Sequence, residues 1–201
     1  MSDPQHVYVV DDDEPVRDSL AFLLTASGFD VETFGSAAEL LPRAEHGPTG
    51  CIVSDIRMPE MTGLDLARTL RAAGTRHRII LITGHGDVPL AVEAMRIGVD
   101  DFIEKPFDDE TIVAAIRSAL GSGGSPDDLR AVAKERYSTL TEGEQALLSR
   151  LITGKTNTAA SEELGVDVRE VEVRRASIMT KMQAKGLPEL VRMALLVERH
   201  G

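Results

Sequence analysis

The sequence predicts an α/β fold, a doubly wound five-stranded parallel sheet, followed by a small all-α domain. Five short runs of apolar and β-branched residues alternate with segments of helical periodicity through residue 120. This alternation is typical of a parallel sheet covered by helices. Gly, Pro or acidic residues bound the runs, as expected where strands end in loops. After residue 140 only helical spacing remains, which predicts the second, all-α domain.

The five strand-like runs are aliphatic and end at turn-forming or acidic residues. They lie at 6–10, 29–34, 51–54, 78–83 and 101–105. The run 78–83 is the most continuous, so we expect a central strand buried on both faces. The run 29–34 alternates apolar and polar residues, as a half-buried edge strand does. The expected strand order is 2-1-3-4-5, in which the first and third strands are neighbours.

The helices between these strands are predicted from caps, stops and apolar stripes. Pro15 suits a first helical turn, and the apolar repeat that follows it stops at Gly28. Ser36 is expected to cap the second helix. Three further stripes mark helices at 64–70, 88–95 and 112–119. Five helices therefore alternate with five strands.

The second part of the chain begins after a Gly- and Ser-rich hinge at 121–126. A short connecting helix is expected at 127–136, and Thr141 with Glu144 fits a capping box. Further helices are predicted at 156–164, 167–182 and 187–198, and the tight turn between the first two of these favours a helix-turn-helix unit. The predicted divisions are a first domain at 1–120, a partly helical linker at 121–137 and a helix-turn-helix domain at 138–201.

Charge and cysteine content exclude several classes of protein. The formal net charge is −11, and residues 138–201 hold nine basic and nine acidic side chains. All the excess negative charge therefore lies in the first part, which phosphate would repel. Cys51 is the only cysteine, so no disulfide or zinc cluster is available. Without a membrane-length apolar run or a signal peptide, we expect a reduced, cytoplasmic protein with no membrane contact.

Acidic residues follow two strands that the expected order makes neighbours. Asp11 and Asp12 follow the first strand, and Asp55 ends the third. Because the carboxyl ends of parallel strands meet at one edge of a sheet, these carboxylates should converge there. Three unpaired anions repel one another. Mg²⁺, which takes few carboxylates together with water and phosphate, would remove that repulsion.

Two other strand ends complete a candidate site. Thr83 offers a hydroxyl and Lys105 an ammonium. Such groups around a carboxylate and a metal suit phosphoryl transfer, which depends mostly on positioning and charge neutralisation. Asp55 would then be the nucleophile and form an aspartyl phosphate. Taken singly, Asp12 is explained as a helix cap, Thr83 as a strand end and Lys105 as a solvated charge; their joint placement favours the site.

These residues stand in motifs that resemble the receiver domain of two-component response regulators. The motifs are VVDDDEPVR at 9–17, DIRMPEMTG at 55–63, ITGHG at 82–86 and EKPF at 104–107. Residues from Leu140 onward resemble a LuxR-type helix-turn-helix domain, and the whole chain resembles the FixJ-like subfamily. The resemblance implies a flavodoxin-like receiver that accepts a phosphoryl group from a sensor histidine kinase and regulates transcription.

The resemblance also implies roles for single residues. Asp55 matches the phosphoacceptor, and Asp12, Asp55 and the main-chain carbonyl of Arg57 match the Mg²⁺ ligands, with Asp11 acting through water. No enzymatic activity is implied beyond Mg²⁺-dependent self-phosphorylation and dephosphorylation on Asp55.

Thr83 and Lys105 match the groups that bind the phosphoryl oxygens. Phe102 falls at the switch aromatic, although a plain core aromatic explains it equally well. A catalytic role for His85 is disfavoured, because phosphoryl capture needs no acid or base from this loop.

In LuxR-type domains the third helix, here roughly 167–182, enters the major groove. Its inward positions are Val171, Ile178 and Met182. The resemblance places base contacts at Glu172, Val173 and Ala176, where Glu can accept from cytosine and the apolar side chains can touch a thymine methyl. The basic residues that could contact phosphate are Arg169, Arg174, Arg175, Lys181 and Lys185.

The helix-turn-helix segment departs from the family pattern and is formally neutral. Gly143 and Gln145 stand where Arg is usual, Glu170 replaces Thr, and Arg174 replaces His. Phosphate contacts dominate affinity, so a monomer should bind DNA weakly. We also expect phosphorylation to promote a homodimer through the helix of Val88, Val92 and Met95 beside the Phe102 strand, because this helix follows the loop after Thr83.

Two other functions compete with this prediction. The C-terminal domain could bind a protein partner through its apolar helix faces instead of DNA. An aspartate-dependent phosphatase of the haloacid dehalogenase type would need Thr where Pro15 stands, so that interpretation is disfavoured.

Overall fold

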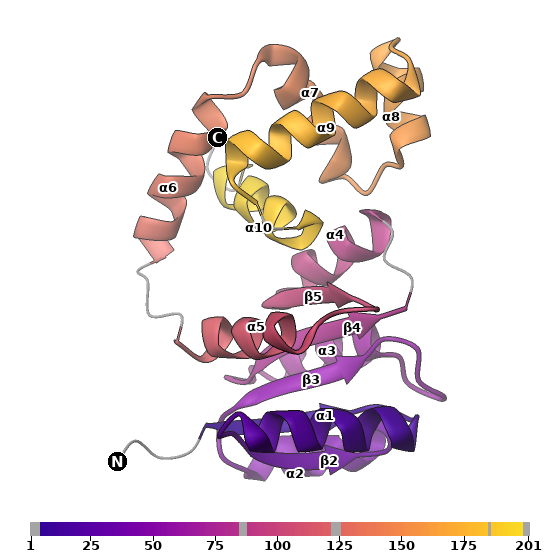
Figure 1. The fold of residues 1–201 in the computed structure, drawn as a ribbon, viewed down its shortest axis with the longest axis vertical. Helices are drawn as coiled ribbons and strands as arrows, with labels where there is room; N and C mark the ends of the chain where they lie inside the picture. The colour runs from indigo at the N-terminus through magenta and orange to yellow at the C-terminus, as the bar shows by residue number, and fades with distance from the viewer. Residues whose placement is uncertain (1–4, 85–87, 122–125, 185, 199–201) are drawn as a thin grey trace. The chain divides into compact units, whose positions relative to one another are not determined.

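The computed structural model describes residues 5–84, 88–121, 126–184 and 186–198 (Figure 1). Contacts within the chain divide it into two compact units. The first comprises residues 1–85 and 97–122, and the second comprises residues 86–96 and 123–201. None of the helices in the described ranges is long and apolar enough to cross a membrane.

The first unit contains one parallel sheet. Its strands are β1 (His6–Val10), β2 (Asp30–Phe34), β3 (Cys51–Asp55), β4 (Arg78–Thr83) and β5 (Asp101–Glu104). They are ordered β2-β1-β3-β4-β5, with every pair parallel. The predicted doubly wound sheet and its strand order are confirmed. The register sets Val9 beside Val53 and Asp55 beside Ile82, so the carboxyl ends of neighbouring strands are aligned.

Burial explains which strands are central. Every residue of β4 after Arg78 is buried, and the last four residues of β1 are buried as well. By contrast, β2 lies at the edge, and all its residues are exposed or half-buried. A fully buried Val, Leu or Ile side chain stabilises a fold by about 1.5–3 kcal/mol. These apolar runs therefore hold the strand ends in fixed positions.

The helices of the first part of the chain begin and end near the predicted positions. They are α1 (Glu14–Ala26), α2 (Ala37–His46), α3 (Gly63–Ala72), α4 (Val88–Ile97) and α5 (Asp109–Gly121). Helices α1 and α5 cover one face of the sheet, where Leu24 and Ile116 pack on Val53 and Ile80. Helices α2 and α3 cover the opposite face (Figure 1). As predicted, Ser36 caps α2, accepting a hydrogen bond from the amide of Glu39.

The described residues after position 125 form five further helices. They are α6 (Pro126–Ser138), α7 (Glu142–Leu151), α8 (Asn157–Leu164), α9 (Val168–Met182) and α10 (Leu187–Glu198). Leu147, Ile178 and Leu190 are fully buried in the core of the second unit. Helix α6 is more than a connector, because Ala133 is fully buried in the same core and Arg136 donates a 3.0 Å hydrogen bond to the carbonyl of Met182.

The turn between α8 and α9 has the geometry that a helix-turn-helix needs. Gly165 ends α8 in the left-handed conformation, with φ of 64°, which costs glycine little. Asp167 then caps α9, its carboxylate accepting a 2.7 Å hydrogen bond from the amide of Arg169. The helices predicted on either side of this turn are confirmed.

Candidate functional site

Three of the predicted site residues meet at the carboxyl-end edge of the sheet. Asp11 follows β1, Asp55 ends β3, and Lys105 follows β5. The ammonium of Lys105 lies 2.7 Å from Oδ1 of Asp55 and 3.3 Å from Oδ2 of Asp11. Residues 94 positions apart in the chain are therefore in one hydrogen-bonded group.

This group has unusual electrostatics because it is largely closed to water. Burial raises the pKa of the Asp11 carboxyl, even though the amide of Asp13 and the ammonium of Lys105 act in the opposite direction. For Lys105, burial by itself lowers the pKa, but the hydrogen bond and charge of Asp55 and the charge of Asp11 outweigh it. The pKa of Lys105 is therefore raised, and its ammonium stays protonated between the two carboxyl groups.

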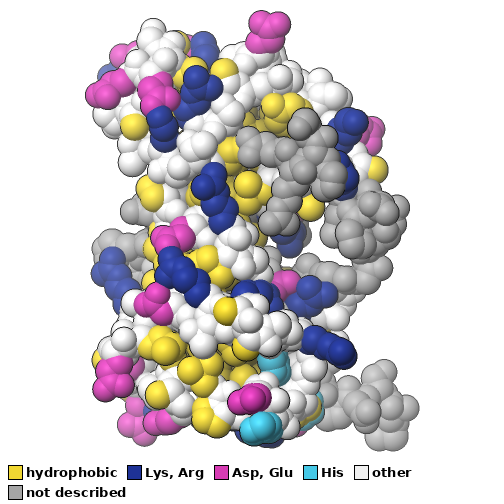
Figure 2. All heavy atoms as spheres, turned by 180° about the vertical axis from the view of Figure 1, so that it is seen from behind, with side chains coloured by type: hydrophobic (Ala, Val, Ile, Leu, Met, Phe, Trp, Pro, Cys, Tyr) yellow, Lys and Arg dark blue, Asp and Glu magenta, His cyan; other side chains and the backbone are white. Residues whose placement is uncertain are grey.

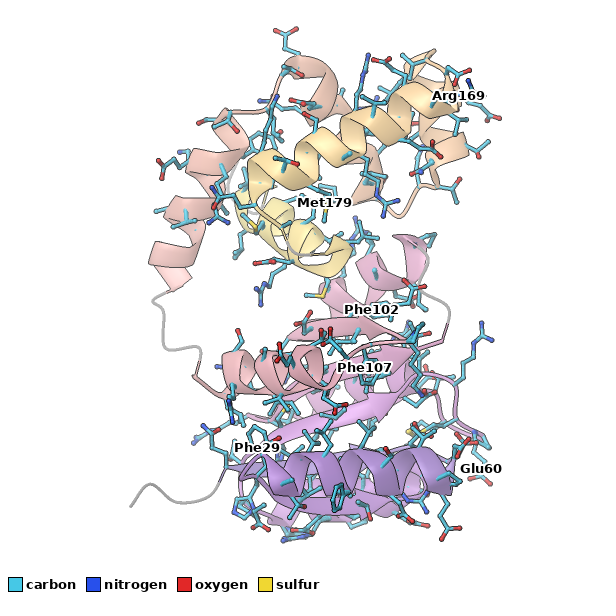
Figure 3. All side chains as sticks on the ribbon, in the orientation of Figure 1. Phe29, Glu60, Phe102, Phe107, Arg169 and Met179 are labelled. Carbon is cyan, nitrogen blue, oxygen red and sulfur yellow. The ribbon has the colours of Figure 1, made fainter. Side chains whose placement is uncertain are left out.

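The loop after β3 holds Asp55 in place. The amide of Arg57 donates a 2.6 Å hydrogen bond to Oδ2 of Asp55, which leaves Oδ1 for Lys105. The loop then returns over the strand end, and Gly63 comes so close that a Cβ there would lie 2.3 Å from the Asp55 carbonyl oxygen. Glu60, labelled in Figure 3, lies in this loop with a positive φ of 65°. The role of Gly63 was missed in the sequence, where it reads only as the start of a helix.

Gly63→Ala is expected to destabilise the first unit and to displace Asp55. The added methyl group would overlap a backbone atom, which cannot move without moving β3. Overpacking of this kind costs about 1–3 kcal/mol. The loss of stability should appear as faster native-state hydrogen exchange of the β3 amides. Gly74→Ala is not a neutral control because its φ is 71°, whereas Gly84→Ala adds a methyl group to open space. Equal hydrogen-exchange protection of the β3 amides in the Gly63→Ala and Gly84→Ala chains would contradict this prediction.

Asp12 is placed differently from its neighbours. It is exposed, and the residue that caps α1 is Asp13, whose carboxylate accepts from the amide of Val16. The interpretation of Asp12 as the helix cap is therefore wrong. In the described part of the chain no three acidic, histidine or cysteine side chains gather as a metal site. Of the three carboxylates expected to converge, Asp11 and Asp55 meet around Lys105, whereas Asp12 is exposed to solvent.

The donors at this edge nevertheless suit a hard divalent cation. Two carboxylates share one ammonium, so the group keeps a net negative charge, and Asp12, the next residue after Asp11, is a further exposed anion. Burial raises the pKa of the Asp11 carboxyl by more than Lys105 and the Asp13 amide lower it. Few carboxylates next to solvent are what Mg²⁺ prefers.

Thr83 and Phe102 lie on the neighbouring strands. Thr83 is fully buried at the end of β4, and its carbonyl accepts a 2.7 Å hydrogen bond from the amide of Lys105. Phe102 lies on β5 opposite Leu81 and is 6% exposed (Figure 3). This burial is compatible with a core aromatic and with a switch in its inward position. His85 lies outside the described residues.

The predicted faces of α9 agree with the structure. Val171, Ile178 and Met182 are fully buried. The positions expected to read bases, Glu172, Val173 and Ala176, are all exposed, and Val173 is 67% exposed despite being apolar. Figure 3 places Arg169 at the N-terminal end of this helix.

The basic residues of α9 differ in their partners. Lys181 forms hydrogen bonds of 2.9 and 2.7 Å with both oxygens of Glu144 on α7, and Arg174 pairs with Glu170 at 3.0 Å. Lys185 lies outside the described residues. In the upper part of Figure 2, basic and acidic side chains lie next to one another and form no continuous basic patch. This agrees with the neutral charge of the segment.

Glu144 is a buried anion held by a dense set of donors. It closes the predicted capping box with Thr141, and it also accepts from Ser177 and Lys181. Burial raises the pKa of its carboxyl, but hydrogen bonds from Lys181, Ser177 and Thr141 outweigh this and lower the pKa to about 2. The capping box could be read from the sequence. The pairing with Lys181, 37 residues away, could not.

Glu144→Gln is expected to destabilise the helical unit by about 1–3 kcal/mol at neutral pH, because the half-buried ammonium of Lys181 loses the anion to which it is hydrogen-bonded. The folded pKa lies below the ordinary value of 4.5, so this stabilisation is complete above pH 4.5 and disappears as the pH falls toward 2. Hydrogen exchange of the α7 and α9 amides as a function of pH measures this stabilisation. The control is Glu142→Gln, an exposed acid in the same turn. A pH-independent difference between the two variants would contradict the assignment.

Comparison with protein families covers both parts of the chain. Residues 7–117 match the response regulator receiver domain, and residues 138–194 match the luxR family of bacterial regulatory proteins. The receiver match includes Asp11, Asp55, Thr83 and Lys105, and the luxR match includes all of α9.

Several named proteins are similar to this chain over nearly its whole length. The chain is 50% identical over 193 residues to the transcriptional regulatory protein FixJ of Azorhizobium caulinodans, which covers 94% of this chain and 92% of the relative. It is 47% identical over 193 residues to FixJ of Rhizobium meliloti, with 94% of both chains covered. Full-length FixJ from B. japonicum has a similar structure, with a TM-score of 0.57, 43% identity and coverage of 96% and 97%. The chain therefore belongs to the two-component response regulators, as a transcriptional regulator that joins a receiver domain to a LuxR-type DNA-binding domain.

Proposed function

We propose that Asp55 accepts a phosphoryl group from a sensor histidine kinase and that this modification controls DNA binding by residues 138–201. The observation that carries the proposal is the group at the strand ends, where Asp55 shares Lys105 with the buried Asp11. In this proposal the chain has no enzymatic activity beyond Mg²⁺-dependent self-phosphorylation and dephosphorylation on Asp55.

The proposed metal site uses the exposed and half-buried oxygens of this edge. Asp12, Asp55 and the main-chain carbonyl of Arg57 would hold Mg²⁺, with Asp11 acting through water. When bound, the cation would neutralise charge on the transferring phosphoryl group.

Each side chain then has a defined task in the transfer. A carboxylate oxygen of Asp55 attacks phosphorus, the P–N bond to the kinase histidine breaks, and the imidazole takes the electron pair of that bond. The ammonium of Lys105 is hydrogen-bonded to Oδ1 of Asp55. After the transfer it would bind a negatively charged phosphoryl oxygen instead. Thr83, at the end of the adjacent strand, supplies a hydroxyl to a second oxygen.

The proposed result of phosphorylation is a homodimer formed through α4 and β5. Val92 and Met95 are 3% and 8% exposed in this structure, so this contact requires that they become accessible; the side chain of Val88 is outside the described residues. Sedimentation with and without beryllofluoride and Mg²⁺ tests the proposal. We expect a dimer only in the treated wild-type chain, and an unchanged monomer would overturn this step.

DNA binding is proposed to occur through the exposed face of α9. Glu172→Ala distinguishes a Glu172 side chain that binds a base from one that only repels the DNA phosphates. If Glu172 accepts a hydrogen bond from a cytosine, the variant loses about 1–3 kcal/mol of discrimination at one base pair. Competition between duplexes that differ at single positions measures this loss.

If Glu172 only faces phosphate, its removal strengthens binding to all duplexes alike, which would contradict a base contact. A treated wild-type chain that retains protein but no DNA from a genomic pool would favour the alternative, a helical domain that binds a protein partner.

A further inference from the structure

The basic residues of α9 divide into two groups by the face of the helix on which they lie. At 100° per residue, Arg174, Ser177 and Lys181 fall on one flank. Contacts show that this flank faces α7. Ser177 and Lys181 bind Glu144, and the guanidinium of Arg174 lies where a Cβ on Gly143 would be 3.1 Å from Nη1. Arg169 and Arg175 lie outside this flank.

Glu144 is built into the contact between α7 and α9. Its side chain is 7% exposed. Four hydrogen bonds reach its two oxygens: Ser177 at 2.5 Å, Lys181 at 2.9 and 2.7 Å, and the amide of Thr141 at 2.7 Å. Because Thr141 fixes Glu144 at the first turn of α7, the ammonium of Lys181 is tied to a fixed point on another helix.

The other cations of α9 are in a different situation. Among residues that the structure describes, no ion pair joins an acidic side chain to Arg169 or Arg175. Arg169 is exposed near the N-terminus of α9, and Arg175 is half-buried and lies about 100° around the helix from Arg174. Their charges are available to an anion that approaches the helix, whereas that of Lys181 is compensated within the protein.

We propose that Lys181 is a positioning residue, which fixes the rotation of α9 through Glu144 and adds no attraction for the DNA backbone. The inference rests on the proposed DNA-binding function and assigns the attraction to Arg169 and Arg175. It also removes Lys181 from the phosphate contacts predicted from the sequence. A helix held by Glu144 keeps Glu172, Val173 and Ala176 in one orientation toward the bases.

A phosphate contact, a residue needed only for folding and a residue that orients α9 can be distinguished by the salt slope, the non-specific affinity and the ratio of specific to non-specific affinity. A phosphate contact contributes about 0.9 to the slope of log affinity against log salt, for all sequences alike. A residue needed only for folding lowers affinity for all DNA by the same factor and leaves the slope unchanged. A residue that orients α9 leaves the slope and the non-specific affinity unchanged and lowers the ratio of specific to non-specific affinity.

The experiment uses the full chain with Mg²⁺ and beryllofluoride. The probes are a duplex enriched from a random-sequence pool by the treated wild-type chain and a shuffled duplex of the same composition. Lys181→Gln is compared with Arg169→Gln and Arg175→Gln, which remove the same charge from the same helix. Salt titrations on both duplexes give the slope and the discrimination ratio, and circular dichroism confirms folding.

We expect Lys181→Gln to keep the wild-type slope and to lose at least about fivefold in discrimination, the lower end of the effect of one base contact. We expect Arg169→Gln and Arg175→Gln to reduce the slope by about 0.9 each and to keep the discrimination ratio. Lys181→Arg, which can still bind Glu144, should restore discrimination. A reduced slope in Lys181→Gln, or equal losses on both duplexes, would overturn the inference.

A second variant removes the anion of the Glu144–Lys181 pair instead of the cation. It tests the inference even if Lys181→Gln does not fold. Glu144→Gln frees the ammonium of Lys181, so binding to the shuffled duplex should strengthen more than in Glu142→Gln, while discrimination falls. Equal effects of the two variants would overturn the inference. A wild-type chain that enriches no duplex would overturn the proposed DNA binding and the inference with it.

Discussion

The Asp55→Asn chain should take up no phosphoryl group from acetyl phosphate and Mg²⁺, whereas the wild-type chain is labelled. An amide at this position has no anionic oxygen to attack phosphorus. The other carboxylates are poor substitutes, because Asp11 is buried and Asp12 is exposed, whereas Lys105 and the amide of Arg57 hold the carboxylate of Asp55 in place. The expected loss is complete, which makes this the largest effect predicted for a single substitution.

Borohydride reduction followed by peptide mapping locates the labelled residue, because it reduces an acyl phosphate to an alcohol. Asp18→Asn is the matched control, since Asp18 is an exposed acid on α1. Reduction at residue 55 in the wild-type and Asp18→Asn chains is the expected result. Label that stays in the Asp55→Asn chain would place the acceptor elsewhere.

Lys105→Met should strengthen Mg²⁺ binding and abolish the response to phosphorylation. The ammonium now occupies the space between Asp55 and Asp11, at 2.7 and 3.3 Å. Its removal leaves two carboxylates without a cation. One unit charge a few ångströms away, with the effective dielectric of a protein surface, changes cation affinity by about tenfold or more. Calorimetric titration with Mg²⁺ measures this gain.

Lys105→Met also lacks the ammonium that would bind the phosphoryl oxygen. Treated with beryllofluoride, it should therefore remain monomeric in sedimentation. Lys134→Met, which removes an exposed lysine on α6, should behave as wild type in both measurements. Weaker Mg²⁺ binding in Lys105→Met, or a normal dimer, would contradict the role assigned to Lys105.

The strand ends of the receiver could be predicted because the sheet is simple. The apolar runs locate the strands, and a parallel sheet brings their carboxyl ends to one edge, so Asp55 and Lys105 could both be placed at that edge. The start of α1 could not be placed with the same accuracy. Three consecutive Asp residues all suit an N-cap, and only the backbone path selects Asp13 and leaves Asp12 to solvent.

Features that depend on the path of a loop or on contacts between distant helices were not predictable. Gly63 marks a helix start in the sequence, but its necessity comes from the return of the loop onto the Asp55 carbonyl. Lys181 stands among other basic residues of α9, and nothing in the local sequence shows that Glu144 compensates its charge. The faces of α9 were predictable, because helical spacing decides them.

The measurement that tests the function most directly is the affinity of the full chain for its enriched duplex, with and without beryllofluoride, in wild-type and Asp55→Asn chains. A neutral domain makes few phosphate contacts as a monomer, and dimerisation doubles them and joins two half-sites. Treatment should therefore raise both the affinity and the salt slope of the wild-type chain and leave Asp55→Asn unchanged. Equal affinity in treated and untreated wild-type chains would contradict control of DNA binding by Asp55.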